Sequence, residues 1–66
     1  GANFTNSSLR GCNLGDTDLR GVNFENADLS GASLSYANLT NTDLSKANLN
    51  GVDLSKAILD STKLPA

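Results

Sequence analysis

The sequence contains no histidine, methionine or tryptophan, one cysteine, one proline and only three aromatic residues. Without histidine, the commonest general acid and base at neutral pH is missing. We find no glycine-rich phosphate loop with a lysine, and no nucleophile beside a plausible base. The single cysteine, Cys12, cannot form an internal disulfide. These absences argue against an enzyme, and we predict no catalytic residue, no cofactor-binding residue and no metal site.

Long apolar runs and an excess of one charge are also missing. No stretch approaches the length of a membrane span, and no signal-peptide pattern opens the chain. The net charge of -2 and the pI of about 4.5 leave no basic surface for nucleic acid or for an anionic membrane. We therefore predict neither nucleic acid nor a membrane as a partner, and nothing indicates a compartment.

What the sequence does contain is a repeat of five residues. Every fifth position holds a large apolar residue, which we call the central residue: Phe4, Leu9, Leu14, Leu19, Phe24, Leu29, Leu34, Leu39, Leu44, Leu49, Leu54, Leu59 and Leu64. Two positions earlier stands a small residue: Ala2, Ser7, Cys12, Thr17, Val22, Ala27, Ala32, Ala37, Thr42, Ala47, Val52, Ala57 and Thr62. The middle residue between them is usually Asn, Asp or Ser.

A period of five fits neither a helix nor a long strand. Alternation holds only locally, which predicts a short extended piece with the small and central residues on one face. The chain must then turn, and the corner residue lies two positions after the central one. Gly or Asn, which tolerate positive φ, predict type II turns at Asn6, Gly11, Gly21, Asn26, Gly31, Asn41 and Gly51. Asp16, Tyr36 and Lys56 lack this tolerance, so we expect another turn type there.

Residues that stack between successive coils should resemble each other, and a spacing of 20 aligns them best. Phe4 then falls on Phe24, and Gly11 on Gly31, whereas a spacing of 15 mixes residue types. Four repeats per coil predict a four-sided solenoid of a little over three coils, with parallel pairing between residues n and n+20.

The triplets Ala27-Asp28-Leu29, Ala37-Asn38-Leu39 and Ala47-Asn48-Leu49 match the pattern A(D/N)LXX literally. The whole chain resembles the pentapeptide repeat family. This resemblance implies an all-β fold, a right-handed quadrilateral parallel β-helix, in which central and small residues point inward. We treat residues 1–66 as a single domain whose interior is filled by side chains and leaves no room for a ligand.

Three side chains are candidates for a role beyond the repeat. Cys12 occupies an inward position, which favours a structural role over a reactive thiol. Tyr36 is the one aromatic residue in an exposed position. Two interpretations stay open: it binds a partner, or it is an ordinary surface residue at a corner. Ile58 is predicted to point outward. Either it contacts a cap, a partner or a second copy, or it is an ordinary exposed residue.

The acidic residues could form a calcium site or imitate DNA phosphates. Asp18, Asp28, Asp43 and Asp53 occupy middle positions, where a short polar side chain bonds nearby backbone. At a spacing of 20 no acid stacks on an acid, which favours stability, since like charges opposite each other destabilise a sheet.

We therefore predict a non-catalytic scaffold or protein-interaction module. The alternative, which only the resemblance implies, is a DNA mimic that acts on a topoisomerase (gyrase), as in quinolone resistance. The low net charge and short length disfavour it. Because Met is absent and Gly1 fills the last position of a repeat, we expect a section of a longer protein. Its partner would be an unknown protein or a flanking cap, and open ends permit end-to-end self-association. Ile58, Lys63 and Pro65 break the pattern near the C-terminal end, and we expect a preceding coil to cover the N-terminal end.

Overall fold

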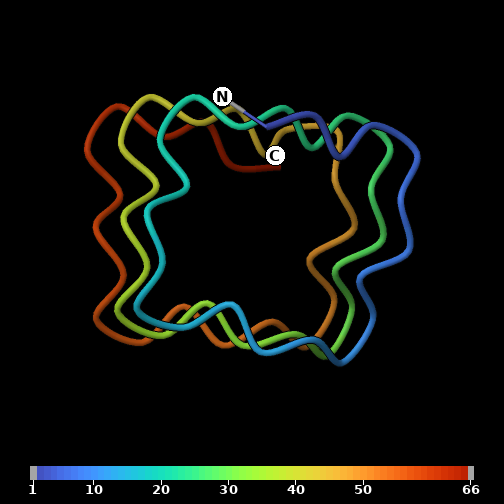
Figure 1. The fold of residues 1–66 in the computed structure, drawn as a ribbon, viewed down its shortest axis with the longest axis horizontal. Helices are drawn as coiled ribbons and strands as arrows, with labels where there is room; N and C mark the ends of the chain where they lie inside the picture. Colours follow the sequence, from blue (N-terminus) through green and yellow to red (C-terminus); the bar gives the residue numbers. More distant parts are fainter. Residues whose placement is uncertain (1, 66) are drawn as a thin grey trace.

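The chain winds into a four-sided coil (Figure 1). The computed structural model describes residues 2–65, so Gly1 lies outside the described residues. Every bridge between described residues is parallel and joins residues n and n+20, from Asn3 with Asn23 to Asp43 with Lys63. The predicted spacing of 20 is confirmed, and the alternative of 15 is excluded.

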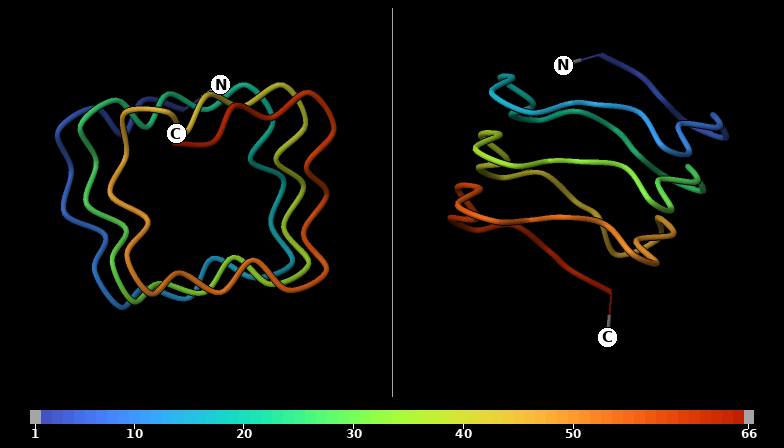
Figure 2. Two further views of the ribbon diagram at one scale, coloured as in Figure 1. Left: turned by 180° about the vertical axis from the view of Figure 1, so that it is seen from behind. Right: turned by 90° about the horizontal axis from the view of Figure 1, so that it is seen from below.

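Successive turns of the coil stack directly on one another (Figure 2). We number the sides in chain order: side 1 comprises 2–6, 22–26, 42–46 and 62–65, side 2 comprises 7–11, 27–31 and 47–51, side 3 comprises 12–16, 32–36 and 52–56, and side 4 comprises 17–21, 37–41 and 57–61. Within residues 2–65 there is no helix, and no strand extends beyond one bridged middle residue. The corners take up the rest of each repeat. No helix in this part of the chain could therefore cross a membrane.

Backbone hydrogen bonds hold each side to the coils on either side of it. The N–H of a central residue donates to the next coil, as from Leu34 to the carbonyl of Asp53 at 2.8 Å. The N–H of a middle residue donates to the preceding coil, as from Ser33 to Cys12 at 2.9 Å. At the corners, the N–H of the small residue donates to the carbonyl of the central residue before it. The short sides are thus paired without forming long strands.

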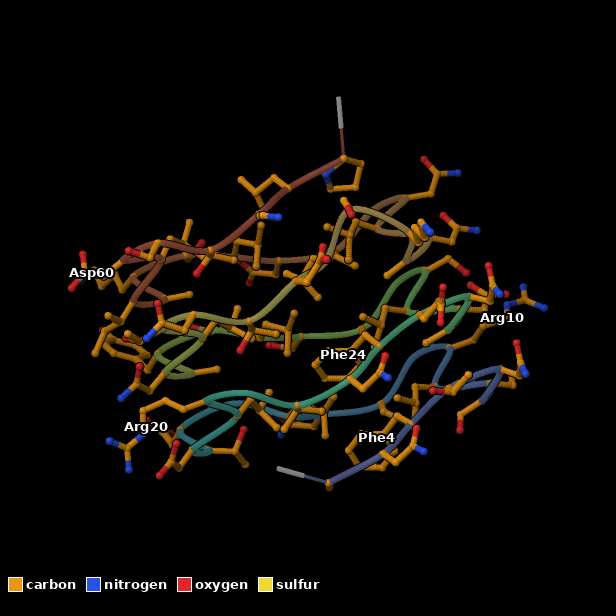
Figure 3. The ribbon with its side chains drawn as sticks, turned by 90° about the horizontal axis from the view of Figure 1, so that it is seen from above. Phe4, Arg10, Arg20, Phe24 and Asp60 are labelled. Carbon is orange, nitrogen blue, oxygen red and sulfur yellow. The ribbon has the colours of Figure 1, made fainter. Side chains whose placement is uncertain are left out.

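The core consists of central and small residues, as the repeat predicts. Phe24, Leu29, Leu34, Leu39 and Leu44 are completely buried. Full burial of such a side chain stabilises a fold by roughly 1.5–3 kcal/mol. The two phenylalanines lie on successive coils inside the solenoid (Figure 3), with ring centroids 5.6 Å apart and planes 14° apart.

The corners confirm one prediction and correct another. Positive φ occurs at all the predicted Gly and Asn positions, namely Asn6, Gly11, Gly21, Asn26, Gly31, Asn41 and Gly51. The expectation of another turn type in the remaining column is wrong: φ is 58° at Asp16, 63° at Tyr36 and 58° at Lys56.

Stacking explains why these three corners turn left-handed. The N–H of Tyr36 donates to the carbonyl of Ser55 at 3.1 Å, and that of Asp16 donates to Ser35 at 3.0 Å. These bonds require the same turn at every level of the column. Left-handed geometry costs an ordinary residue about 1–2 kcal/mol, and the ladder of paired backbone outweighs that preference.

Candidate functional site

The outer sides of the solenoid carry polar side chains that bond the chain's own backbone. The side chain of a middle residue accepts from the N–H two residues later, as Asp28 does from Ser30 at 3.0 Å. The same bond occurs at Asn3, Asn13, Asp18, Asn23, Asp28, Ser33, Asn38, Asp43, Asn48 and Asp53. This pattern explains the preference for Asn, Asp and Ser at the position. These side-chain oxygens therefore stabilise the local turn of the backbone.

The acidic residues in this pattern have lowered pKa values. The hydroxyl of Ser30 bonds the Asp28 carboxylate at 2.7 Å and lowers its pKa, as does the backbone N–H of Ser30. Ser45 and Ser55 lower the pKa values of Asp43 and Asp53 in the same way. In each case, hydrogen bonds favour the charged form.

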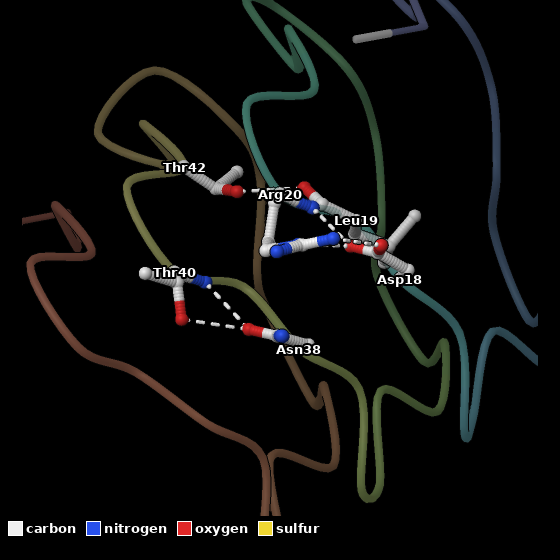
Figure 4. Close-up of polar contacts among 6 residues, drawn as sticks. All are labelled: Asp18, Leu19, Arg20, Asn38, Thr40 and Thr42. Carbon is white, nitrogen blue, oxygen red and sulfur yellow. Dashed lines mark hydrogen bonds and ion pairs between the residues drawn. The ribbon is translucent and has the colours of Figure 1, made fainter.

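Asp18 has the largest resolved shift on the surface. The guanidinium of Arg20 holds it with bonds of 2.8 Å and 2.7 Å (Figure 4), and the Arg20 N–H adds a third at 3.2 Å. The side-chain bonds from Arg20 are the largest cause that lowers the pKa of Asp18 to about 2. An exposed carboxylate held ionised in this way is suited to stabilising the surface and not to transferring protons.

The arrangement of the acids matches the predicted stability pattern. Asp28 is bridged to Ser8 and Asn48, and Asp43 is bridged to Asn23 and Lys63, so no acid is bridged to another acid. Within residues 2–65, no three metal-binding side chains gather in one place. Such mixed columns do not favour the alternative of a DNA mimic.

Side 1 contains a weakened place in the ladder that the sequence analysis missed. Asn23 and Asp43 are still bridged, but among the described residues the N–H groups of Phe24 and Asp43 donate no close backbone hydrogen bond, although the corresponding groups on the other sides do. A hollow of about 350 Å³ lies there, and Gly21, Val22, Asn23, Glu25, Asn41, Asp43 and Lys46 line it. We call it the side-1 hollow.

Lys46 marks the edge of this hollow with an irregular corner. It is absent from the residues with positive φ, which include every other corner between Asn6 and Ser61. The N–H of Asn26 donates to Lys46 itself at 2.9 Å, whereas the regular partner is the residue before the corner. The Lys46 ammonium lies 3.5 Å from the Glu25 carboxylate. The one available sequence signal is a lysine stacked above Asn6 and Asn26.

Four large apolar side chains are exposed in the described residues. Leu59 and Leu64 are central residues in the last coil, whereas Tyr36, 54% exposed, and Ile58, 46% exposed, lie at outward positions of the repeat. The Lys56 ammonium lies 5.6 Å from the centre of the Tyr36 ring, and Lys56 is two residues from Ile58. Both predictions of outward exposure are confirmed, and the coil brings the two residues to adjoining parts of sides 3 and 4.

Cys12 lies at an inward position, as predicted, in the same column of small residues as Ala32 and Val52 of the next two coils. It is half-buried in the first coil. Its neighbours in the column are apolar, which suits a small hydrophobic side chain.

Comparison with known proteins is informative at the level of family. A model described as "Pentapeptide repeats" matches residues 1–35 and 23–60, with eight copies of the repeat. A search of curated proteins found no match. Among solved structures, the chain is similar to HetL, described as a pentapeptide repeat protein involved in heterocyst differentiation regulation from the cyanobacterium Nostoc sp. strain PCC 7120.

The similarity to HetL extends over most of this chain. The TM-score is 0.64 and the sequence identity is 40%, over 94% of this chain and 32% of HetL. The chain thus spans about a third of the length of that relative. The family and this neighbour imply a right-handed β-helix, in agreement with the parallel bridges. The chain belongs to the pentapeptide repeat family.

Proposed function

We propose that the chain is a non-catalytic scaffold that binds another protein through its outer sides. Its quadrilateral β-helix would comprise about three coils of four repeats. The inward side chains fill the interior, and Phe24, Leu29, Leu34, Leu39 and Leu44 are completely buried. Binding is therefore left to the outer surface and the ends of the coil.

The observation that carries this proposal is the exposure of Tyr36 and Ile58 on the outer sides, apart from Leu59 and Leu64 in the last coil. Apolar side chains that adjoin one another on the surface mark interaction sites, whereas single ones are ordinary, and aromatic residues are enriched at protein interfaces. HetL, a similar solved structure, is involved in the regulation of heterocyst differentiation. A regulatory role exercised by binding suits a rigid repeat surface without catalytic groups.

Photo-crosslinking tests the proposal. We would place p-benzoyl-phenylalanine at one partly exposed position on each side, in place of Thr5, Ser30, Ser35 and Thr40 in turn. Irradiation of the cells that produce the protein should give a covalent adduct with another protein from at least one side. A variant with the same group in place of buried Leu34 is the control. The absence of an adduct from all four sides would contradict the proposal.

A further inference from the structure

Ile58 occupies a middle position, and all other middle positions except Lys63 hold a residue whose side chain can accept a hydrogen bond. Below it in the same column, Asp18 and Asn38 accept from the backbone N–H groups of Arg20 and Thr40. Ile58 has no oxygen in its side chain, so it cannot accept in this way from the N–H of Asp60. The substitution also leaves an apolar side chain nearly half exposed. Residues that break a local rule without structural gain are expected at functional positions.

Tyr36 and Lys56 extend this apolar position across the corner between sides 3 and 4. Lys56 lies directly above Tyr36 in the corner column, and its ammonium is placed over the ring. Among the described residues, Arg10, Arg20 and Lys46 pair with carboxylates, but Lys56 forms no ion pair. The surface therefore combines two apolar side chains with a positive charge that no carboxylate neutralises.

We infer that Tyr36, Lys56 and Ile58 form the docking surface for a partner protein that presents an apolar side chain beside a carboxylate. This inference rests on the proposed function and specifies its surface. The apolar side chain would cover Ile58 and the edge of the Tyr36 ring. The carboxylate would meet the Lys56 ammonium, which the ring already orients. Charge complementarity of this kind favours a correct partner and speeds its approach.

A peptide titration tests the chemistry of the surface. The probes are the capped peptides Glu-Leu-Phe-Glu-Leu and Lys-Leu-Phe-Lys-Leu, added to the ¹⁵N-labelled chain. The acidic peptide should shift the amide signals of residues 36, 56 and 58, and the basic peptide should bind about tenfold more weakly. Equal binding of both peptides, shifts confined to other sides, or no shift with the acidic peptide would overturn the inference.

The variant Ile58→Asn separates docking from folding. Asparagine restores the acceptor for the Asp60 N–H, so the thermal midpoint should rise or stay unchanged. Affinity for the acidic peptide should nevertheless fall about tenfold, because the exposed apolar contact is lost. Lys56→Glu should weaken binding of the acidic peptide and strengthen that of the basic one. Unchanged binding by a folded Ile58→Asn chain would overturn the inference.

The crosslinking experiment distinguishes this inference from the proposed function. Thr40 on side 4 and Ser30 on side 2 are matched positions, since each hydroxyl bonds a middle side chain two residues earlier. We expect an adduct from position 40 that disappears when Ile58→Asn is added. An adduct from position 30 alone would overturn the inference but leave the proposed function intact. An adduct of twice the chain's mass, or a crosslink within one chain, would mean that the occupant is not the proposed partner.

Discussion

The hydroxyl of Thr42 donates a 2.7 Å hydrogen bond to the carbonyl of Leu19, 23 residues earlier and one coil away. The two residues lie at the corner between sides 4 and 1 (Figure 4). The hydroxyl of Thr62 repeats the bond one coil later, at 2.6 Å to Leu39. Threonine at the small inward position of side 1 thus bonds its hydroxyl to the backbone of the coil before it.

Replacing Thr42 with valine removes this connection and keeps the shape of the side chain. We expect Thr42→Val to lower the free energy of unfolding by about 1 kcal/mol, the usual contribution of one hydrogen bond. Thr62→Val is the matched control and should cost less, because Thr62 is only partly buried. Chemical denaturation measures both, and an equal or larger loss at Thr62 would contradict the reasoning.

The corner at Lys56 stores backbone strain that a single substitution should relieve. Its φ of 58° is costly for lysine but tolerated by asparagine. We expect Lys56→Asn to raise the free energy of unfolding by about 0.5–1 kcal/mol, a part of the strain of a left-handed residue. Arg10→Asn controls for the loss of charge, because the 3.9 Å ion pair of Arg10 with Asp28 is exposed and such pairs contribute little to stability. A destabilised Lys56→Asn chain would show that the contact with Tyr36 is worth more than the strain.

The same substitution at Lys46 should change the structure as well as the stability. Asparagine matches Asn6 and Asn26 in its column, both of which have positive φ. We expect Lys46→Asn to turn its corner left-handed, so that the Asn26 N–H donates to Ser45 and the side-1 hollow narrows. A crystal structure of the variant, or its backbone couplings in NMR, would show the change. A corner that keeps its present geometry would mean that the rest of the hollow, and not Lys46, weakens the ladder.

Much of this fold could be predicted from the period of five residues. Central apolar residues define the core, and Phe4 above Phe24 indicates the 20-residue coil. The wrong expectation at Tyr36 came from treating its corner in isolation, whereas bonds to the next coil determine the turn. The Thr42–Leu19 bond and the side-1 hollow depend on distances between coils, which a one-dimensional pattern does not contain. The exposure of Ile58 and its closeness to Lys56 were predictable, whereas the place of Tyr36 beside them depends on the register between coils.

The free energy of unfolding should depend on pH in the acidic range, because Asp18 has a lowered pKa in the folded chain. The pKa is about 2 in the folded chain and about 3.9 in an unfolded one. The carboxylate therefore contributes stability above pH about 4, and this contribution is lost as the pH falls toward 2. Carboxyl ¹³C shifts in NMR would give the pKa directly. Arg20→Gln should raise it by removing the largest cause, and a pKa near 3.9 in the unaltered chain would contradict the expected pairing.

The first coil offers the last test, because its outer edge is open in the described residues. Neither the N–H nor the carbonyl of Asn3 has a backbone partner there, and Phe4 is only partly buried. The expectation that a preceding coil covers this edge remains a prediction. Twenty residues of repeat sequence placed before the chain should bury Phe4, pair Asn3 and raise the thermal midpoint. Phe4 alone would contribute about 1 kcal/mol, since part of its area is already buried.

Thermal unfolding at several concentrations checks this prediction and reveals end-to-end association, which would cover the same edge. The control carries an extension of equal length with serine at the central positions, because it adds chain without adding a core. The intended extension should raise the midpoint, and the serine extension should not. If both leave the midpoint of a monomeric sample unchanged, the edge at Asn3 and Phe4 needs no covering coil, and the expectation of a preceding coil is wrong.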